Sequence, residues 1–410
     1  MSDDRAGEIA RFLAQPALAR LLSALDGDGE ETRVVGGAVR NLLLGEPASD
    51  IDLATTALPQ ETMRRGKAAG FKAVPTGIEH GTVTLVADGT SFEVTTLRRD
   101  VETDGRRAKV VFGRDFAADA LRRDFTINAL GLGRDGTVHD YCGGLDDLAQ
   151  RRVRFIGDAA TRIREDYLRI LRFFRFHARY GVGVPDAEGL RACIAGRDGL
   201  DGLSRERVRA ELLKLLVAPS VADTIGAMAG AGLLMPVIGG VPHLSRFAAI
   251  ARDDGAGVHP AFRLAALAVS VGEDASRLRD RLRLSNDEFD RIERIARALE
   301  GLGGLASLPG IATLRHVAHG CGRDAAAAAL VLLNASARGE GGDGVQRLIA
   351  ELGRTPPFLP TGKDVVGRGI APGPGVGRVL AAARRRWIET GCPASAEAQF
   401  ALLDAAAGQA

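Results

Sequence analysis

The hydrophobic pattern of this 410-residue chain changes near residue 150, and the change limits the folds that are open to it. Before that point, apolar and polar residues alternate in short segments bounded by turn residues, which predicts strands at 33–35, 50–54, 81–87 and 91–97. Beyond it, such segments stop, and helical patterns at 159–180 and 205–216 begin a series of helices. We therefore expect an α+β fold, with a mixed-sheet head followed by an all-helical remainder.

The segments between these elements carry weaker signals. Residues 6–25 have the pattern of one amphipathic helix, and residues 38–44 and 58–69 predict two more. Asp88, Gly89 and Thr90 separate two of the strands and predict a hairpin turn. Residues 98–115 are rich in charge and glycine, so we expect a mobile loop there. The glycines at 373–377 follow no strand and predict an ordinary loop.

Composition narrows the possible partners less than the motifs do. Lys and Arg number 54 against 52 Asp and Glu, so the formal net charge of +2 neither requires nor excludes a nucleic-acid partner. Nearly all the positive charge is arginine, which suits phosphates and base edges but equally fits a GC-rich genome. The four cysteines form no CxxC pair, so we expect free thiols. No long apolar run occurs, so we expect a cytoplasmic protein without a signal peptide or membrane span.

The strongest local signal joins a glycine turn to two aspartates. Gly36 and Gly37 separate a strand from a helix, where backbone N–H groups can approach a phosphate, and Arg40 can reach the same anion. Asp50 and Asp52 are two residues apart on a predicted strand and therefore face the same side. Adjacent carboxylates repel each other unless a cation lies between them, and their hard oxygens suit Mg²⁺. The alternative is a turn followed by two solvated aspartates.

Glu93 is a charge within the otherwise apolar strand predicted at 91–97. If that strand pairs beside the one that holds Asp50 and Asp52, it supplies a third carboxylate. Three carboxylates with two ions would serve in-line displacement at phosphorus, because the ions stabilise the entering and leaving oxygens. On its own, Glu93 would be a solvent-facing strand residue.

An arginine pair follows at Arg122 and Arg123, directly before Asp124. Two guanidinium groups beside a carboxylate can hold a triphosphate while the carboxylate orients one of them. The alternative is a surface salt bridge at the start of a helix.

The segment that begins at Glu165 places Asp166 and Arg169 three positions apart on a predicted helix, where they would be neighbours. A carboxylate accepts and a guanidinium donates, which matches the pairing edges of cytosine and adenine and mismatches uracil and guanine. Each unsatisfied group in a mismatch costs roughly 1–3 kcal/mol. An ordinary intrahelical ion pair is the alternative. Arg172 lies to one side and Arg175 faces away, so phosphate, RNA or another domain is expected to bind Arg175.

Taken in order, these motifs resemble the class II tRNA nucleotidyltransferase and bacterial poly(A) polymerase family of the polymerase β-like nucleotidyltransferase superfamily. The resemblance is strong over about residues 32–180, and a weaker one at 361–377 is similar to the family's tRNA-holding tail. It implies three parts: a catalytic head at 1–150, a helical neck with base recognition at 151–220, and a helical RNA-binding body and tail at 221–410.

The resemblance also implies roles for single residues. Mg²⁺ would be the cofactor on Asp50 and Asp52, with Glu93 in the catalytic set. Glu165, Asp166 and Arg169 would select the base. The incoming CTP or ATP would be contacted by Gly36, Gly37, Arg40, Arg123, Asp166, Arg169, Arg172 and Arg175. The family's loop that corresponds to 98–113 helps the switch from adding C to adding A, so its presence argues against a relative that adds only C.

The implied function is template-free addition of C, C and A from CTP and ATP to the 3′ end of tRNA, with release of pyrophosphate. The alternatives are a poly(A) polymerase that extends RNA with ATP and a catalytically dead RNA-binding relative. Neither terminal segment is basic, which favours CCA addition, and the complete carboxylate set disfavours the dead relative. Asn41 stands where the family has Asp, which we expect to tune the site without abolishing it.

Overall fold

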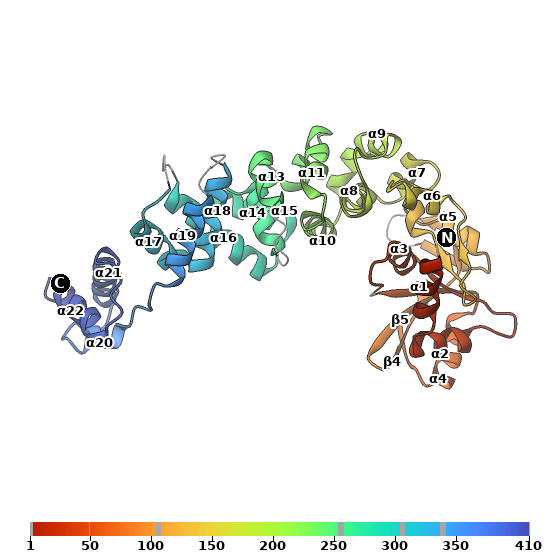
Figure 1. Cartoon of the computed structure of the whole chain (residues 1–410), viewed down its shortest axis with the longest axis horizontal. Coiled ribbons are helices and arrows are strands. Elements are labelled where there is room, and N and C mark those ends of the chain that lie inside the picture. Colours follow the sequence, from red (N-terminus) through yellow and green to blue (C-terminus); the bar gives the residue numbers. More distant parts are fainter. Residues whose placement is uncertain are drawn as a thin grey trace. The chain divides into compact units, whose positions relative to one another are not determined.

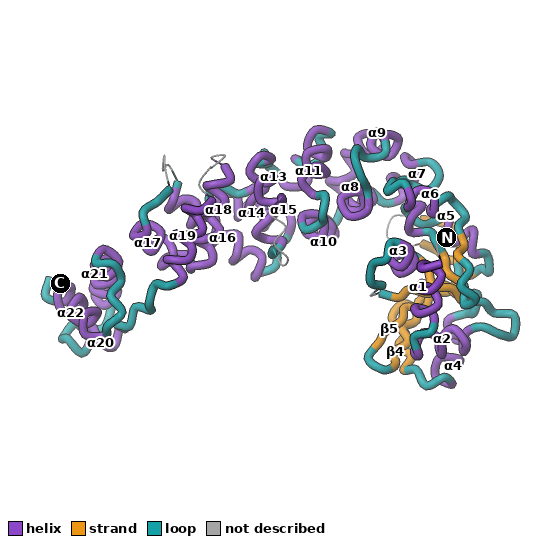
Figure 2. Tube along the Cα trace, viewed as in Figure 1, coloured by secondary structure: helices purple, strands orange, loops and turns teal. Residues whose placement is uncertain are grey.

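The computed structural model describes residues 3–48, 50–103, 108–252, 258–303, 308–336 and 342–409. Within it the chain forms two compact units, Met1–Leu233 and Leu234–Ala410 (Figure 1). All the described strands lie in the first unit, and the described elements of the second unit are helices (Figure 2). The predicted change from a mixed head to a helical remainder is therefore confirmed.

The described part of the first unit is built on a seven-stranded sheet with the order β3-β4-β5-β2-β1-β8-β9. Strands β2 and β5 run parallel, whereas the other neighbouring pairs are antiparallel. The four predicted strands are all present. The strands are β1 (Thr32–Val35), β2 (Ile51–Thr55), β3 (Lys72–Gly77), β4 (Thr82–Ala87), β5 (Thr90–Thr96), β8 (Gly131–Leu132) and β9 (Val138–His139).

Two helices pack closely on this sheet, and one of them, α3 (Gly37–Leu43), begins at the glycine turn. Helix α4 (Pro59–Ala68) packs against β3 and β4, and a methyl group built on Gly66 would lie 2.7 Å from a carbon of the fully buried Leu85. Helix α3 packs against β1 and β2. Because Val35 pairs in register with Asp52, the turn between β1 and α3 lies at the same sheet edge as that aspartate.

Three local predictions in the head differ from the structure. The single helix expected over 6–25 is two helices, α1 (Asp3–Leu13) and α2 (Pro16–Leu25), because Pro16 lacks an N–H and fits only the first turn of a new helix. Strand β3 is missing from the prediction because Pro75 interrupts its pattern. It is an edge strand, where a lost hydrogen-bond donor is tolerated.

The loop expected over 98–115 contains two strands, and that prediction was wrong. Strand β6 (Arg98–Thr103) pairs antiparallel with β7 (Ala108–Phe112), and helix α5 (Phe116–Leu121) follows with Asp115 as its N-cap. The strand-forming Val, Thr and Phe residues of this segment are interspersed with charges that concealed the pattern. Residues 104–107 lie outside the described residues.

The helix expected over 159–180 is broken in two, α7 (Ala159–Glu165) and α8 (Leu168–Tyr180). Asp166, between them, is extended, with φ −157° and ψ 105°. Its carboxylate accepts from the backbone N–H of Leu168 at 3.1 Å, so its side chain competes with continuation of the helix. The helix predicted at 205–216 is confirmed as α10 (Arg205–Leu216), and the first unit also contains α6 (Gly144–Ala149), α9 (Ala187–Ala195) and α11 (Val221–Gly230).

A buried aromatic cluster joins α8 to the end of the head. The ring centroids of Phe125 and Phe155 are 4.9 Å apart, and those of Phe155 and Phe173 are 5.4 Å apart, with all three side chains fully buried. Since Phe173 belongs to α8, this contact holds the helix that carries Arg169, Arg172 and Arg175 against the segment after Arg123.

The described regular elements of the second unit are all helices. Buried Arg246 on α13 (Leu244–Arg252) donates to the carbonyls of Ala265, Ala266 and Val269 at the C-terminal end of α14 (Pro260–Ala268). The other helices are α12 (Met235–Ile238), α15 (Gly272–Leu282), α16 (Asn286–Leu302), α17 (Ile311–Cys321), α18 (Arg323–Ser336), α19 (Gly342–Gly353), α20 (Gly362–Val366), α21 (Pro374–Glu389) and α22 (Ala396–Ala407).

The last three helices share a small core of their own, with Val365, Val379 and Leu403 at its centre. The loop expected at 373–377 is wrong, because α21 begins at Pro374, a residue that favours the first turn of a helix. None of the described helices combines the length and apolar character needed to cross a membrane.

Candidate active site

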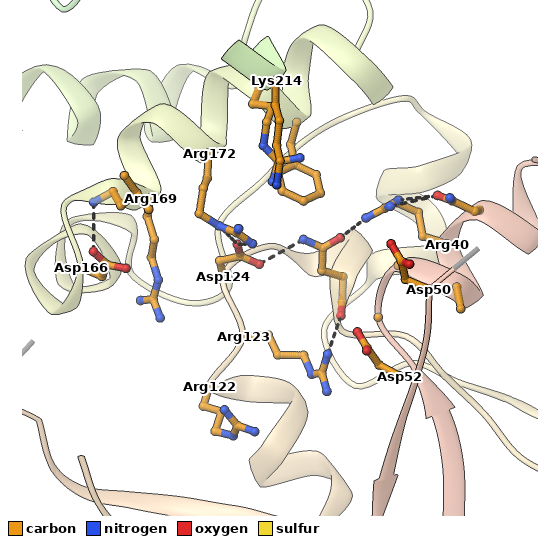
Figure 3. Close-up of a pocket in the computed structure, with 18 of the residues that line it drawn as sticks. Arg40, Asp50, Asp52, Arg122, Arg123, Asp124, Asp166, Arg169, Arg172 and Lys214 are labelled. Atoms are coloured by element: carbon orange, nitrogen blue, oxygen red, sulfur yellow. Dashed lines mark hydrogen bonds and ion pairs between the residues drawn. The ribbon is translucent and has the colours of Figure 1, made fainter. Parts of the chain in front are cut away.

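A cleft of about 720 Å³ lies within the first unit, bordered by α3, β2, the segment around Arg123, and helices α8 and α10 (Figure 3). The structure brings together here nearly all the residues that the sequence motifs singled out. Twelve of them line the cleft: Gly36, Gly37, Arg40, Asp50, Asp52, Arg122, Arg123, Asp124, Asp166, Arg169, Arg172 and Arg175. Glu93 and Glu165 lie outside its lining.

The turn between β1 and α3 requires glycine for two reasons. Gly36 has a φ of 73°, in the left-handed region that side chains disfavour. A methyl group on it would also lie 3.1 Å from Nη1 of Arg123. The bare backbone of this turn therefore lets the Arg123 guanidinium lie directly against it, at the wall of the cleft.

Asp50 and Asp52 lie together in the cleft, whereas Glu93, expected as a third carboxylate of the metal site, lies beside Asp52 in the sheet and outside the cleft lining. Asp52 on β2 is the register partner of Glu93 on the parallel strand β5, and Asp50 lines the cleft next to Asp52 (Figure 3). Loss of hydration raises the pKa of Asp52. The charges of Glu93 and Asp50 raise it further, while Arg123 opposes the shift. No described residue donates a hydrogen bond or forms an ion pair to Asp50, Asp52 or Glu93, so Arg123 offsets the charge of Asp52 only from a distance.

The arginine pair is held by a carboxylate that the sequence motif did not indicate. Asp119, which is only 4% exposed, pairs with Arg122 at 2.6 Å and with Arg123 at 3.3 Å. Asp124, the residue expected to orient one of them, instead pairs with Arg172 of α8. The expectation for Asp124 was wrong because the chain bends at Asp124, whereas Asp119 on α5 is three and four positions before the two arginines and reaches both guanidinium groups.

The expected pairing of Asp166 with Arg169 on one helical face was also wrong. Asp166 lies before α8 in the extended segment, and its Oδ2 accepts from Nη2 of Arg207 on α10 at 2.7 Å. Nη1 of Arg169 donates to Glu165 and to the carbonyl of Arg162. Both side chains still line the cleft, so a carboxylate and a guanidinium face the same end of it (Figure 3).

Helix α10 supplies a wall of the cleft that the sequence motifs missed. Glu211, which is 7% exposed, pairs with Arg175 through Nε, and the Arg172 guanidinium is 3.7 Å from the same carboxylate. Arg207 and Lys214 from this helix also line the cleft. Spacings of four and three place all three on one helical stripe, a signal that the sequence contained. Arg175 lines the cleft, whereas the sequence predicted that it faces away. The prediction assumed one continuous helix from Asp166 to Arg175, and the break before α8 changes the direction of Asp166 relative to that helix.

The side chain of Arg40 is buried, and its donors are largely used by neighbouring side chains. Its guanidinium donates to the Tyr180 hydroxyl at 2.6 Å, to the Asn128 side chain, and to Oδ1 of Asn41 at 2.9 Å. It lies 4.0 Å from the centre of the Tyr180 ring, and burial lowers its pKa. Asn41, in turn, donates to the carbonyl of Pro47 at 3.3 Å. A neutral side chain at position 41 thus has its hydrogen-bonding groups occupied in this network.

Comparison with known proteins gives these features a context. Residues 32–154 match the family model of the poly A polymerase head domain. A stretch of 190 residues, 46% of this chain, is 50% identical to the CCA tRNA nucleotidyltransferase 1, mitochondrial, of Danio rerio and covers 44% of it. For the Homo sapiens protein of the same name, the identity is 42% over 268 residues, which is 64% of this chain and 61% of that protein. The matched stretches thus span less than two thirds of these relatives.

Solved structures match over nearly the whole chain. The Bacillus stearothermophilus CCA-adding enzyme in complex with CTP has a TM-score of 0.74 and 28% identity, covering 97% of this chain and 98% of that one. The Thermotoga maritima CCA-adding enzyme complexed with tRNA has the same coverage and a TM-score of 0.72, and its 20% identity supports likeness of fold.

Proposed function

We propose that this chain, whose residues 32–154 belong to the poly A polymerase head-domain family, is a CCA-adding nucleotidyltransferase that transfers C, C and A from CTP and ATP to the 3′ end of tRNA. The supporting observation is one cleft with Asp50 and Asp52 at one end and Asp166 and Arg169 at the other (Figure 3). A nucleotide that spans this cleft has its phosphates at the first end and its base at the second. The full-length likeness to a CCA-adding enzyme in complex with CTP supports the same assignment.

Base choice follows from the groups at the second end. Asp166 offers a carboxylate acceptor. Arg169 is held through Nη1 by Glu165, and neither Nε nor Nη2 of Arg169 donates to a described residue. Glu165 is thus a positioning residue for Arg169. Cytosine and adenine present an amino donor beside a ring-nitrogen acceptor and satisfy both groups, whereas uracil and guanine present the reverse. Each unsatisfied group in a mismatch costs about 1–3 kcal/mol. The protein can therefore select the base without a template.

The carboxylates at the first end fit Mg²⁺. Asp50 and Asp52 have no described partner, and their mutual repulsion together with that of Glu93 is relieved by a cation between them. Among the described residues, no three His, Cys, Asp or Glu side chains form a metal site by themselves. Two carboxylates completed by substrate phosphates and water are the ligand set that Mg²⁺ favours. When bound, the ion supplies charge neutralisation for the entering and leaving oxygens.

The reaction is an in-line displacement at the α-phosphorus of the nucleotide. A bond forms between the 3′ oxygen of the RNA and this phosphorus, and the hydroxyl proton is lost to water. The bond from phosphorus to the oxygen that bridges the α- and β-phosphates breaks, and pyrophosphate leaves. Arg122 and Arg123, held by Asp119, line the cleft on the side of Asp52 and bind the leaving group (Figure 3). Arg172 and Arg175 contribute further positive charge along the nucleotide.

The remaining assignments extend the same proposal to the whole chain. Residues 1–150 carry catalysis, 151–220 base recognition, and 221–410 the binding of RNA. Cytoplasmic location stays a prediction of the sequence, since two of the relatives above are named as mitochondrial proteins.

Incubating the protein with Mg²⁺, tRNA that lacks its CCA end, and labelled CTP or ATP tests the proposal. We expect two C additions from CTP alone, and one terminal A from ATP once the tRNA ends in CC. Long runs of A added to unrelated RNA would indicate a poly(A) polymerase instead. A variant with both Asp50→Ala and Asp52→Ala is the control, and equal transfer by it, or no C addition by the unaltered protein, contradicts the proposal.

A further inference from the structure

One cation in the cleft differs from all the others. Eight cationic side chains line the cleft, and six of the seven arginines form ion pairs with a nearby Asp or Glu. The seventh, Arg40, is buried and donates to Tyr180 and Asn41. Lys214 alone has neither an ion pair nor a hydrogen bond with any described residue. Its charge is therefore available to a ligand without the loss of an internal contact.

Lys214 is placed by the same helix that orients the other cleft residues. Arg207, Glu211 and Lys214 follow each other on α10 at spacings of four and three, which places them on one stripe. Arg207 and Lys214 line the cleft, and Glu211 between them pairs with the cleft residue Arg175. The first two are fixed by Asp166 and Arg175, so the stripe is held in place. Lys214 continues it as an exposed side chain on a rigid support.

The direction of the reaction indicates which phosphate Lys214 meets. In-line displacement requires the entering and leaving oxygens to lie on opposite sides of the α-phosphorus. Arg122 and Arg123, which take the leaving pyrophosphate, lie on one side of the cleft in Figure 3, and Lys214 lies on the opposite side. The 3′ hydroxyl of the RNA must therefore approach Asp50 and Asp52 from the side of Lys214.

We propose that Lys214 binds a backbone phosphate near the 3′ end of the RNA acceptor and marks the side of the cleft through which that end enters. The inference rests on the proposed nucleotidyl transfer. A lysine suits this task because its ammonium group is a compact charge on a flexible stem, whereas a guanidinium fork demands one fixed geometry. An acceptor that grows by three nucleotides presents a slightly different phosphate position at each step.

The test compares Lys214→Ala with Lys67→Ala, which removes the same charge from an exposed position on α4 outside the cleft. The dissociation constant of tRNA ending in CC is measured at several KCl concentrations. For Lys214→Ala we expect binding about three- to tenfold weaker. The slope of log affinity against log salt should shrink by roughly 0.7–0.9, the value for one lost phosphate contact. The Michaelis constant for ATP at saturating tRNA should stay within about twofold.

Four further results decide between these readings. Lys214→Arg keeps the charge, and because tRNA ending in CC presents a single phosphate position, it should restore most of the affinity for this tRNA. Loss of fold or packing would not allow such a rescue. If Lys214→Ala raises the Michaelis constant for ATP and leaves tRNA binding unchanged, Lys214 binds a phosphate of the nucleotide, and the proposal is overturned. If the unaltered protein adds C and A while Lys214→Ala binds tRNA like Lys67→Ala, the Lys214 inference fails and the proposed function stands. If the unaltered protein adds neither, both fail.

Discussion

Arg207 donates from Nη2 to Oδ2 of Asp166 at 2.7 Å, while the other oxygen of that carboxylate accepts from the backbone N–H of Leu168 at 3.1 Å. Both oxygens of Asp166 are therefore oriented by contacts from different elements, α10 and the start of α8. A base that binds there meets an acceptor whose direction is set before it arrives, which is the condition for discrimination by hydrogen bonding.

Replacing Arg207 by Ala should therefore weaken base choice more than it weakens turnover. We expect the ratio of kcat/KM for CTP to that for UTP to fall about tenfold, because a freely rotating carboxylate accepts less selectively. Single-addition assays with each nucleotide measure this ratio. Arg205→Ala, at the start of the same helix and outside the cleft, is the matched control. Equal losses for CTP and UTP would show that Arg207 only supports the fold.

Replacing Asp119 by Asn should impair nucleotide use while leaving tRNA binding intact. The carboxylate is buried and holds both Arg122 and Arg123, so a neutral amide leaves the two guanidinium groups without a fixed direction. We expect kcat/KM for ATP to fall about ten- to a hundredfold. The dissociation constant of tRNA, measured alongside, should change by less than about twofold. Full activity of this variant would show that Arg122 and Arg123 do not bind the pyrophosphate.

The raised pKa of Asp52 predicts a dependence of stability on pH and on metal. Because the folded pKa lies above the ordinary value of 3.8, the contribution of Asp52 to stability is full below that value and is lost as pH rises through the folded pKa. At neutral pH, without metal, Asp52→Asn should therefore raise the Tm. Mg²⁺ should raise the Tm of the unaltered protein and have a smaller effect on the variant. An unchanged Tm in both comparisons would contradict a shared cation site at Asp50 and Asp52.

Arg246 predicts a stability effect confined to the second unit. Burial lowers the pKa of Arg246 to about 10, yet the side chain satisfies three carbonyl oxygens at the end of α14. Arg246→Met should lower the free energy of unfolding by about 2–4 kcal/mol, since it leaves buried acceptors unpaired. Chemical denaturation of the full chain measures this, with exposed Arg252→Met on the same helix as control. CTP binding by the first unit should not change.

The sequence patterns predicted best where the relevant spacing is local. The period of two placed Asp52 and Glu93 on strands, and the glycine turn placed Gly36 at the end of β1, because strand alternation is a short-range property. The pairing of the two strands was only a condition of the sequence argument, and the structure supplies it. The patterns failed at Asp166, where the apolar period of a helix continues through the break. A single side-chain contact to Leu168, rather than any change in pattern, ends the regular structure there.

The counter-charges of the arginines could not be predicted for a different reason. Asp119 lies close to Arg123 in sequence, but Asp124 was the nearer candidate, and only the fold shows that it turns toward Arg172. Glu211 is 36 positions from Arg175. The segment around it has the sequence of an ordinary solvated helix, so nothing local indicated a partner for Arg175. Charged residues of α10 at spacings of four and three were the available signal, although such stripes are common on surfaces.

The acids that pair with the cleft arginines act as built-in counter-ions. Because these carboxylates stay on their arginines while other guanidinium N–H groups meet the phosphates, they reduce the net positive charge that the phosphates meet. Such partial neutralisation keeps the site from holding its product as tightly as a bare cluster of guanidinium groups would. Escape of the leaving group, and hence readiness for the next addition, is thus promoted by Asp119 and Glu211 as much as capture is by the arginines.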